Sequence, residues 1–379
     1  MICPRSVLLM ARQLDLGGTE RQLCELAKAL DRSRFAPHVG CFHAQGFRAE
    51  DLRAAGVPIL HLPVASYLRP GALRGAWQMA RYIRQHDIRI VHTFDVPLNQ
   101  FGVPVARACS VPVVISSQRA HRDLLSARSP GFNRHFLRLT DMMVDAVVVN
   151  SLAVRRHLVE DERVPAARIQ VCYNGLDTAR FQPGPRLRPP ELRDARCVIG
   201  ALCAFRPEKD LPTLVAAFAQ IRPLFPGLKL LLVGDGPMRE PLARTIDQLG
   251  LAQDCRIEPA TSEVPLWLRA IDVFVLPSLS ESLSNSLMEA MACGCCVVAS
   301  RVGGNPELVD DGRTGLLFRA GDAADLAACL RRLVQDEELR RELASAGSAF
   351  IARGFSLEAS ARRMEEIYET LLRQAVAGG

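Results

Sequence analysis

The sequence predicts an α/β protein with two domains, for three reasons. The chain has 379 residues, 49% of them apolar, which exceeds the size at which one hydrophobic core usually stops growing. Short strand-like runs alternate with longer helical patterns along most of the chain. Residues 182–190 interrupt this alternation with four prolines, which lack an N–H donor and restrict their neighbours. We therefore predict a first domain over residues 1–185, a linker at 182–190, and a second domain over 191–355.

The positions of individual elements follow from local patterns. Strands are expected over residues 6–10, 37–42, 88–93, 111–116, 146–150, 169–173, 197–202, 229–233 and 272–276. Helices are expected over residues 19–30, 211–221 and 237–249, and Ser151 is expected to cap a helix that follows a strand. The last helical pattern, residues 357–373, is expected to cross back, so that residues 356–379 join the first domain.

Charge is distributed unevenly along the chain. Residues 1–190 contain 26 Lys and Arg against 15 Asp and Glu, whereas residues 191–379 contain 21 against 26. A basic first half can attract an anionic membrane surface, a phosphorylated acceptor or nucleic acid, or it can be a solvated arginine-rich face. Nucleic acid is disfavoured because the basic residues are not interleaved with aromatic ones. No apolar run approaches the ~20 residues that span a bilayer, so we expect a cytoplasmic protein, either free or peripheral on the inner face of the membrane.

The twelve cysteines are scattered among apolar residues, which is typical of reduced, buried thiols in a large chain. Cys293, Cys295 and Cys296 form the one close cluster. Because no second cysteine or histidine pair accompanies it at zinc-site spacing, we expect structural cysteines and no metal.

A polar segment, residues 277–291, follows a strand-like run and leads into a helix. The first N–H groups of a helix lack internal partners and lie at the positive end of its dipole, so Leu283, Ser284 and Asn285 are expected to bind a diphosphate. Glu289 lies roughly 6 Å further along the axis, within reach of a ribose. Glu281 lies on the other side of the helix start, where it could bind sugar hydroxyls or stabilise positive charge at an anomeric carbon. The alternative for both glutamates is a solvated helix face.

Two further segments have residues suited to phosphate. The chain has 44 Arg and three Lys, and Lys209 follows a strand in the segment Arg206-Pro-Glu-Lys-Asp, so we expect it to be a compact phosphate-binding charge. An ordinary surface loop is the alternative. Gly17 and Gly18 lie between the first strand and the first helix, where a backbone could approach a ligand closely. The G-x-G-x-x-G fingerprint is missing there, which disfavours a dehydrogenase.

In this order and spacing, these features resemble the retaining, GT-B fold glycosyltransferases of family 4. Glu281 and Glu289 match that family's E-x7-E pair, Lys209 its donor-phosphate lysine, and Gly17-Gly18 its first-domain glycine loop. Residues 174–177 (Asn-Gly-Leu-Asp) and 233–237 (Val-Gly-Asp-Gly-Pro) are similar to two more of its segments. The resemblance implies two Rossmann-like domains with parallel sheets facing across a cleft, a donor held mainly by the second domain, an acceptor met by the first, no metal or other cofactor, and retention of anomeric configuration.

The sequence departs from the family pattern at several positions. Ala204 stands where the family often has a phosphate-binding arginine, and Arg206 is expected to replace it. Ser282 and Cys296 stand in place of a usual glycine and proline. Gln118 aligns with a sugar-contacting histidine, so the nearby His121 is the catalytic candidate, whereas His92 is expected to close a strand.

We therefore predict a glycosyltransferase that moves a sugar from a UDP- or GDP-sugar to a hydroxyl of an oligosaccharide, lipid-linked glycan or other cell-envelope acceptor. Two alternatives remain. One is another GT-B nucleotide-sugar enzyme of the epimerase type, which needs no acceptor. The other is a non-catalytic, donor-binding partner subunit.

Overall fold

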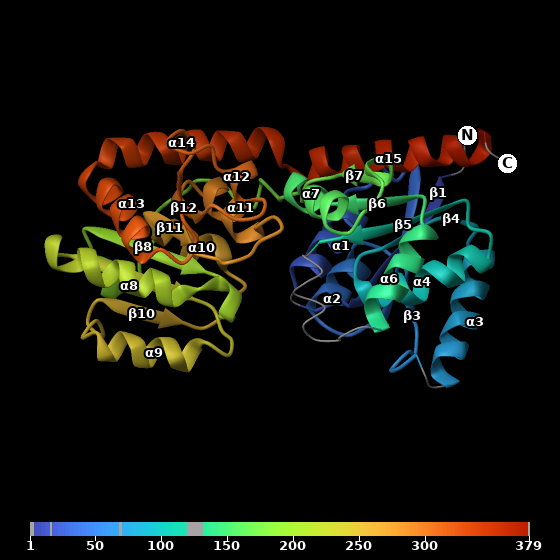
Figure 1. The fold of residues 1–379 in the computed structure, drawn as a ribbon, viewed down its shortest axis with the longest axis horizontal. Coiled ribbons are helices and arrows are strands. Elements are labelled where there is room, and N and C mark those ends of the chain that lie inside the picture. Colours follow the sequence, from blue (N-terminus) through green and yellow to red (C-terminus); the bar gives the residue numbers. More distant parts are fainter. Residues whose placement is uncertain (1–3, 16, 68–69, 120–131, 378–379) are drawn as a thin grey trace. The chain divides into compact units, whose positions relative to one another are not determined.

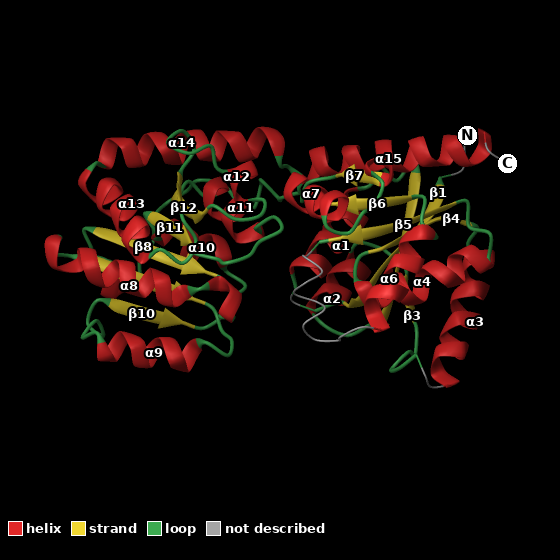
Figure 2. Ribbon diagram, in the orientation of Figure 1, coloured by secondary structure: helices red, strands yellow, loops and turns green. Residues whose placement is uncertain are grey.

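The chain forms two compact units. The computed structural model describes residues 4–15, 17–67, 70–119 and 132–377. The first unit contains residues 1–175 and 357–379, and the second contains residues 176–356. In each unit a parallel sheet carries helices on both faces (Figure 1 and Figure 2). The predicted α/β class, with two Rossmann-like parallel sheets, is confirmed.

The first unit is built on a sheet of seven parallel strands in the order β3-β2-β1-β4-β5-β6-β7. The strands are β1 (Arg5–Gln13), β2 (Phe35–His43), β3 (Ile59–His61), β4 (Ile88–Thr93), β5 (Val113–Gln118), β6 (Ala146–Val149) and β7 (Ile169–Val171). The helices are α1 (Gly18–Ala29), α2 (Phe47–Ala54), α3 (Pro70–Gln85), α4 (Val96–Ala108), α6 (Phe132–Met142), α7 (Leu152–Glu160) and α15 (Leu357–Ala377). The strand order reverses between β1 and β4, and in such sheets ligands bind outside the carboxyl ends of the strands at the reversal.

Two apolar cores cover the two faces of this sheet. Successive side chains of a strand point to opposite faces, so Val7 and Leu9 of β1 enter one core while Leu8 and Met10 enter the other. The first core also contains residues of α1, α2 and α15, including the fully buried Tyr368. The second contains residues of α3, α4 and α7. The last helix is therefore an integral part of the first unit.

The second unit is built on six parallel strands in the order β10-β9-β8-β11-β12-β13. The strands are β8 (Cys197–Leu202), β9 (Leu228–Val233), β10 (Cys255–Glu258), β11 (Val273–Leu276), β12 (Cys296–Ser300) and β13 (Leu316–Phe318). The helices are α8 (Leu211–Ile221), α9 (Arg239–Gln248), α10 (Val264–Ala270), α11 (Asn285–Ala292), α12 (Asn305–Leu308), α13 (Ala323–Gln335) and α14 (Glu337–Gly354). Among the described residues, no helix is long and apolar enough to cross a bilayer.

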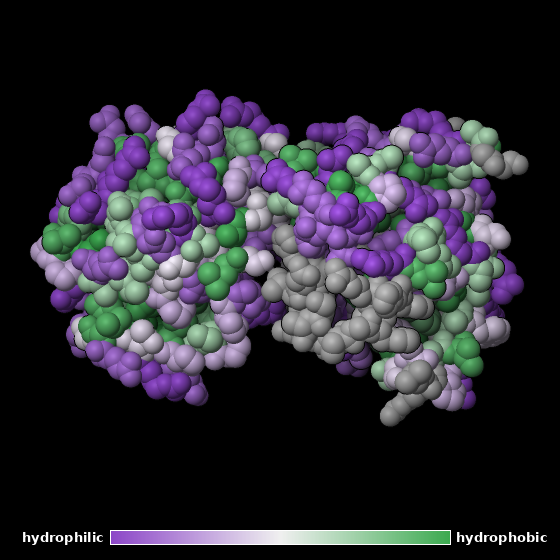
Figure 3. Space-filling view, viewed as in Figure 1, coloured by the Kyte–Doolittle hydropathy of each residue, from purple (hydrophilic) through white to green (hydrophobic). Residues whose placement is uncertain are grey.

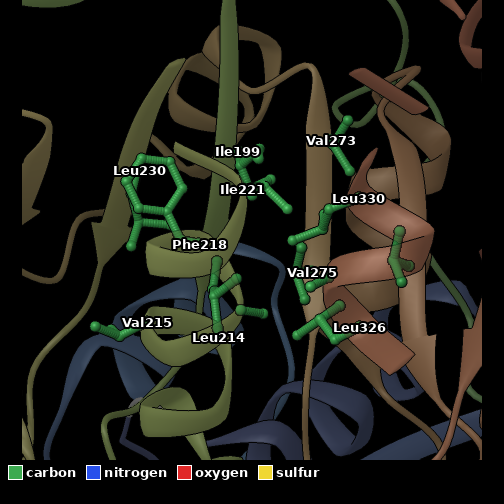
Figure 4. Packing of buried hydrophobic residues seen from close by; sticks show 14 of the residues in the cluster. Ile199, Leu214, Val215, Phe218, Ile221, Leu230, Val273, Val275, Leu326 and Leu330 are labelled. Atoms are coloured by element: carbon green, nitrogen blue, oxygen red, sulfur yellow. The ribbon is translucent and has the colours of Figure 1, made fainter. Parts of the chain in front are cut away.

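The core of this unit lies between the sheet and the helices α8 and α13. Figure 4 shows Phe218 and Leu214 of α8, and Leu326 and Leu330 of α13, packed beside strand residues such as Val275. All five are completely buried. This packing fixes the carboxyl ends of β8 and β11, from which the predicted donor-binding loops extend.

Most of the predicted elements are found, whereas several helices, including α14 with 18 residues, had no predicted bounds. Strands β4 and β8 and helix α8 have the predicted bounds, and the Ser151 side chain accepts a hydrogen bond from the Val154 N–H, so the predicted cap is confirmed. Strand β5 begins at Val113, two residues later than predicted. Strands β3, β10, β12 and β13, of three to five residues each, were not predicted, whereas the equally short β6, β7 and β11 were.

The proline-rich segment requires a correction, because it is part of the second unit and the chain leaves the first unit at Gly175. Arg186 and Arg188 both form ion pairs with Asp272, whose side chain is only 3% exposed. Asp272 also accepts a hydrogen bond from the Val198 N–H at 2.8 Å. The segment is thus anchored to the amino edge of the second sheet, which composition alone did not indicate.

The cysteine cluster is structural. Cys293, Cys295 and Cys296 are all buried, and the Cys295 thiol donates to the Leu268 carbonyl at 3.1 Å. Burial raises the pKa of Cys293 and of Cys296 to about 12, so both thiols are protonated near neutral pH. No group of three His, Cys, Asp or Glu side chains that could hold a metal ion occurs among the described residues.

Candidate active site

The predicted anion-binding loop, residues 277–284, connects β11 to α11 at the carboxyl edge of the second sheet. Helix α11 begins at Asn285, as predicted, and the Ser284 hydroxyl caps it by accepting a hydrogen bond from the Leu287 N–H at 3.3 Å. Leu283 and Ser284 are buried. Packing therefore holds the helix start in place, with the positive end of its dipole at the edge where parallel sheets bind ligands.

Lys209 and Glu281, which are 72 positions apart in the sequence, meet at this edge. The Lys209 ammonium forms an ion pair with Glu281 Oε1, and the Ser278 hydroxyl donates to the same oxygen at 2.8 Å. The side chains of Lys209 and Glu281 are 19% and 10% exposed. The sequence suggested a separate task for each residue, and their direct contact is a finding of the structure.

Lys209 is held in its charged form. Burial by itself would lower its pKa, but attraction to and hydrogen bonding with Glu281, aided by Cys203 and Glu208, outweigh burial and raise the pKa above 10.5. Among the described residues, the hydrogen bond to Glu281 is the only one that the ammonium makes. Because an ammonium has three N–H donors, two of them can still bind an anion.

Glu289 lies one turn inside α11 and is only 3% exposed. The alternative of a solvated helix face is therefore excluded for this residue, and the 10% exposure of Glu281 excludes it there as well. Carboxylates are rarely buried to this extent without a partner. The two glutamates of the E-x7-E pair thus lie inside the protein, on either side of the start of α11.

Arg206 is placed differently. It precedes the short 3-10 turn Pro207–Lys209 that carries Lys209, but its side chain is 62% exposed. Its ion-pair contact is with Glu208, at 4.0 Å. The structure thus does not bring Arg206 to the Lys209–Glu281 pair, and its predicted role as a replacement for the missing arginine stays a prediction.

Two glycines of the segment Val-Gly-Asp-Gly-Pro support the loop that leads to Lys209. A Cβ on Gly234 would lie 1.9 Å from the Cys203 carbonyl oxygen, and one on Gly236 would lie 2.6 Å from that of Phe205. Both have positive φ, which favours glycine. These residues therefore act through backbone packing beneath the site.

A loop after β12, which sequence reasoning missed, supports Glu281 from the other side. A Cβ on Gly303 would lie 1.6 Å from the Glu281 carbonyl oxygen. The Ser300 hydroxyl donates to the Ser278 carbonyl at 2.5 Å, and the Asn305 amide donates to the Ser300 carbonyl at 2.9 Å. The available signal was the pair Gly303-Gly304 shortly after the buried strand β12, which ends at Ser300, at the same sheet edge as the predicted site.

In the first unit, Gly17 and Gly18 lie where they were expected. Gly17 is the N-cap of α1, and it follows β1 at the carboxyl edge of the sheet, next to the reversal in strand order. Its backbone is extended, so it does not need glycine for its φ value. A Cβ on Gly17 would lie 1.9 Å from Glu20 Oε2, so the Glu20 carboxyl lies against this backbone, and the ligand contact of the two glycines stays a prediction.

The histidine prediction falls partly outside the described residues. His121 is not among the described residues, whereas Gln118, at the end of β5, is described and is buried. Arg119 follows, with its guanidinium donating to Asn174 Oδ1 at 2.8 Å, and burial lowers its pKa to about 10. Sequence reasoning passed over Arg119, although a cation directly after a buried strand was a usable signal.

His92 is a core residue of the first unit. It lies in β4, is completely buried, and hydrogen-bonds the Tyr368 hydroxyl through Nδ1 and the Ser117 hydroxyl through Nε2, both at 2.8 Å. Burial lowers its pKa well below the ordinary value, so the ring is neutral near neutral pH. His92 lies in a strand, as expected, but the strand ends one residue later, at Thr93.

Solved structures share the GT-B fold of this chain over nearly its whole length. Anabaena HepE, solved in complex with UDP, superposes with a TM-score of 0.81 at 22% identity, covering 97% of this chain and all of HepE. Sucrose-phosphate synthase from Thermosynechococcus elongatus superposes with a TM-score of 0.79 at 20% identity, covering 99% of this chain and all of that one. Two parallel α/β units with this topology define a GT-B protein.

Sequence relatives place the chain within that class. Residues 16–180 match the model for Glycosyltransferase Family 4, and residues 196–336 match that for glycosyl transferases group 1. The D-inositol 3-phosphate glycosyltransferase of Thermobifida fusca is 31% identical over 75% of this chain and 70% of the relative. A Mycobacterium tuberculosis enzyme, GDP-mannose-dependent alpha-(1-6)-phosphatidylinositol monomannoside mannosyltransferase, is 28% identical over 88% of this chain and 90% of the relative. The chain belongs to the group 1, family 4 glycosyltransferases.

Proposed function

We propose that this glycosyltransferase moves a sugar, with retention, from a UDP- or GDP-sugar to a hydroxyl of an oligosaccharide, a lipid-linked glycan or another cell-envelope acceptor. The observation that carries the proposal is the cluster of Lys209, Glu281 and Ser278 beside the start of α11. A cation with unused donors next to a helix N-terminus suits a diphosphate. A carboxylate bound to that same cation suits the sugar attached to the diphosphate.

Each site residue then has a chemical task. The bond between the anomeric carbon and the diphosphate breaks and its electron pair stays on the diphosphate. The acceptor oxygen bonds to the carbon, and its proton passes to the departing diphosphate. Lys209 offsets the growing charge on the diphosphate, with the amides of Leu283, Ser284 and Asn285 around it. Glu281 positions the sugar. Charge stabilisation by a lysine and a helix start supports transfer without a metal or other cofactor.

The remaining predicted residues have proposed tasks of their own. Glu289, buried one turn inside α11, holds the ribose. Arg206 approaches the diphosphate once a donor is bound, and Gly17 and Gly18 meet the ligand through their backbone. His121 contacts the transferred sugar.

The names of relatives support the donor and acceptor classes. The mycobacterial relative is named as GDP-mannose-dependent and as acting on a phosphatidylinositol monomannoside, and the Thermobifida relative is named for inositol 3-phosphate. HepE is solved with UDP. These names favour nucleotide-sugar donors and phosphorylated or lipid-linked acceptors, and the basic first half of this chain favours an anionic membrane surface as a partner.

Thermal stabilisation by a panel of UDP-, GDP-, ADP- and TDP-sugars tests the donor site. A donor at 100 times its Kd adds roughly 2.7 kcal/mol to the free energy of unfolding. We expect one nucleotide class to stabilise the wild type, and Lys209→Ala and Glu289→Ala to lose the response. Lys229→Ala is the matched control, because Lys229 is also ion-paired in the second unit, at 2.8 Å from Asp254, but lies at the start of β9.

The panel also separates the alternatives. If Lys209→Ala responds to the donor as the wild type does, the proposed diphosphate site is wrong. Product analysis distinguishes a glycosyltransferase from an enzyme of the epimerase type, because the latter releases a changed sugar without any acceptor. Donor binding with no transfer to any acceptor in a screen supports the non-catalytic partner subunit instead.

A further inference from the structure

Helix α3 presents two large apolar side chains to solvent. Leu73 is 77% exposed and Trp77 is 60% exposed, and they lie one helical turn apart on the same face. The opposite face, with Met79 and Ile83, is buried in the core beside α4. Packing of this face fixes the rotation of α3 about its own axis. Trp77 is therefore held on the exposed side of the helix.

The same exposed face carries only positive charge. Arg74, Arg81 and Arg84 are exposed, and α3 contains no acidic residue. The Arg81 guanidinium lies 5.6 Å from the centre of the Trp77 ring. None of the three arginines is in an ion pair with another described residue. In Figure 3 hydrophilic and hydrophobic residues lie next to one another over α3, at the lower right.

This combination matches the chemistry of an anionic bilayer surface. Helices that lie in a membrane interface bury Trp and Leu among the acyl chains while arginines contact the headgroups. An anionic surface attracts each nearby cation, which raises the partition coefficient roughly fivefold per arginine. The absence of an acidic residue on α3 removes the repulsion that such a surface would otherwise exert.

We propose that the face of α3 formed by Leu73, Arg74, Trp77, Arg81 and Arg84, here called the α3 face, docks on an anionic lipid bilayer. The inference rests on the proposed function only in that a lipid-linked acceptor gives docking a purpose. The interaction itself requires neither donor nor transfer. It assigns the membrane contact to one helix, which the net charge of the first half could not do.

The two tryptophans of the chain, Trp77 and Trp267, provide a direct test. The full-length Trp267→Phe variant has Trp77 as its only tryptophan. With vesicles of equal parts phosphatidylglycerol and phosphatidylcholine, we expect its emission to shift to the blue, and with pure phosphatidylcholine or at high salt we expect no shift. The Trp77→Phe variant, which retains Trp267, should show no shift under any of these conditions.

Cosedimentation with the same vesicles measures the charge contribution. Changing Arg74, Arg81 and Arg84 together to glutamine should lower the partition coefficient roughly a hundredfold. The matched control changes three exposed arginines of the second unit to glutamine, namely Arg244, Arg313 and Arg341. This control variant should bind the vesicles nearly as the wild type does. Unchanged thermal midpoints would show that both triple variants are folded.

Four outcomes would overturn the proposal. Vesicle binding by the triple α3 variant at the wild-type level, or binding without a Trp77 shift, would place the membrane contact elsewhere. Absence of binding to anionic vesicles would exclude docking. A Trp77 shift that depends on protein concentration in the absence of vesicles would show self-association instead. Because none of these measurements uses a donor, their failure leaves the donor-binding test unaffected.

Discussion

Replacing Lys209 by methionine is expected to destabilise the second unit, because it removes the cation from the Glu281 carboxylate. Removing one partner of a buried ion pair costs about 3–5 kcal/mol, whereas surface pairs contribute ~0–1 kcal/mol. The two side chains are 19% and 10% exposed, which places this pair towards the buried case. We therefore expect a loss of about 2–3 kcal/mol, or roughly 5–10 °C in the unfolding midpoint of a unit of this size.

Calorimetry at pH 7 on Lys209→Met, Glu281→Gln and the double variant measures this effect. The loss should largely vanish in the Glu281→Gln background, because the unpaired charge is then gone. Lys229→Met is the control: the side chains of Lys229 and Asp254 are 26% and 13% exposed, but Asp254 keeps a second partner, Arg222, at 2.7 Å. Because no carboxylate is left unpaired, this variant should cost under about 1 kcal/mol. A loss from Lys209→Met that is as small as the control, or that persists undiminished in the double variant, would refute the reasoning.

The pH dependence has a definite sign. The folded-state pKa of Lys209 lies above the ordinary value of 10.5, so its contribution to stability is fully present below pH 10.5. As the pH rises through the higher folded-state pKa, this contribution is lost. The Lys209→Met variant should lack this part of the alkaline destabilisation.

Two further variants test the packing around the site and the core of the first unit. Gly303→Ala should abolish the thermal stabilisation by the donor, because the new Cβ would lie 1.6 Å from the Glu281 carbonyl oxygen. The control is Gly312→Ala: Gly312 also has a positive φ, but a Cβ there meets no atom within 4 Å, so this variant should keep the stabilisation by the donor. A shared loss in both variants would mean that backbone strain, not contact with Glu281, matters. His92→Phe should lower the unfolding free energy of the first unit by about 2 kcal/mol, because the buried Tyr368 hydroxyl loses its partner. Calorimetry measures this, and the donor response should be unaffected; an unchanged midpoint would show that water or repacking compensates.

The strand and helix patterns were sufficient to predict the fold. Strand β8 is an apolar run of six residues, long enough for its type to be read locally. The three-residue strands β3 and β13 were missed, although β7, which is as short, was predicted. The proline-rich segment was misplaced because its anchor, Asp272, lies more than 80 residues away.

The candidate site was partly predictable. The start of α11 at Asn285 and the positions of Glu281 and Glu289 around it follow from one continuous segment, so local pattern was enough. The Arg206 prediction came from the same kind of proximity in sequence, and the structure leaves that side chain 62% exposed. Proximity along the chain does not determine the direction in which a side chain points.

By itself, the sequence determined which residue types are available: the glutamates of one helix start, a lysine retained among arginines, and glycines at the ends of strands. Only the tertiary structure decided that Lys209 binds Glu281, that Gly303 supports Glu281 from a third loop, and that α3 turns Trp77 outward. The physical reason is that a parallel sheet brings the carboxyl ends of distant strands to one edge. Which side chains meet there depends on strand order and packing, and neither is encoded within any single segment of the chain.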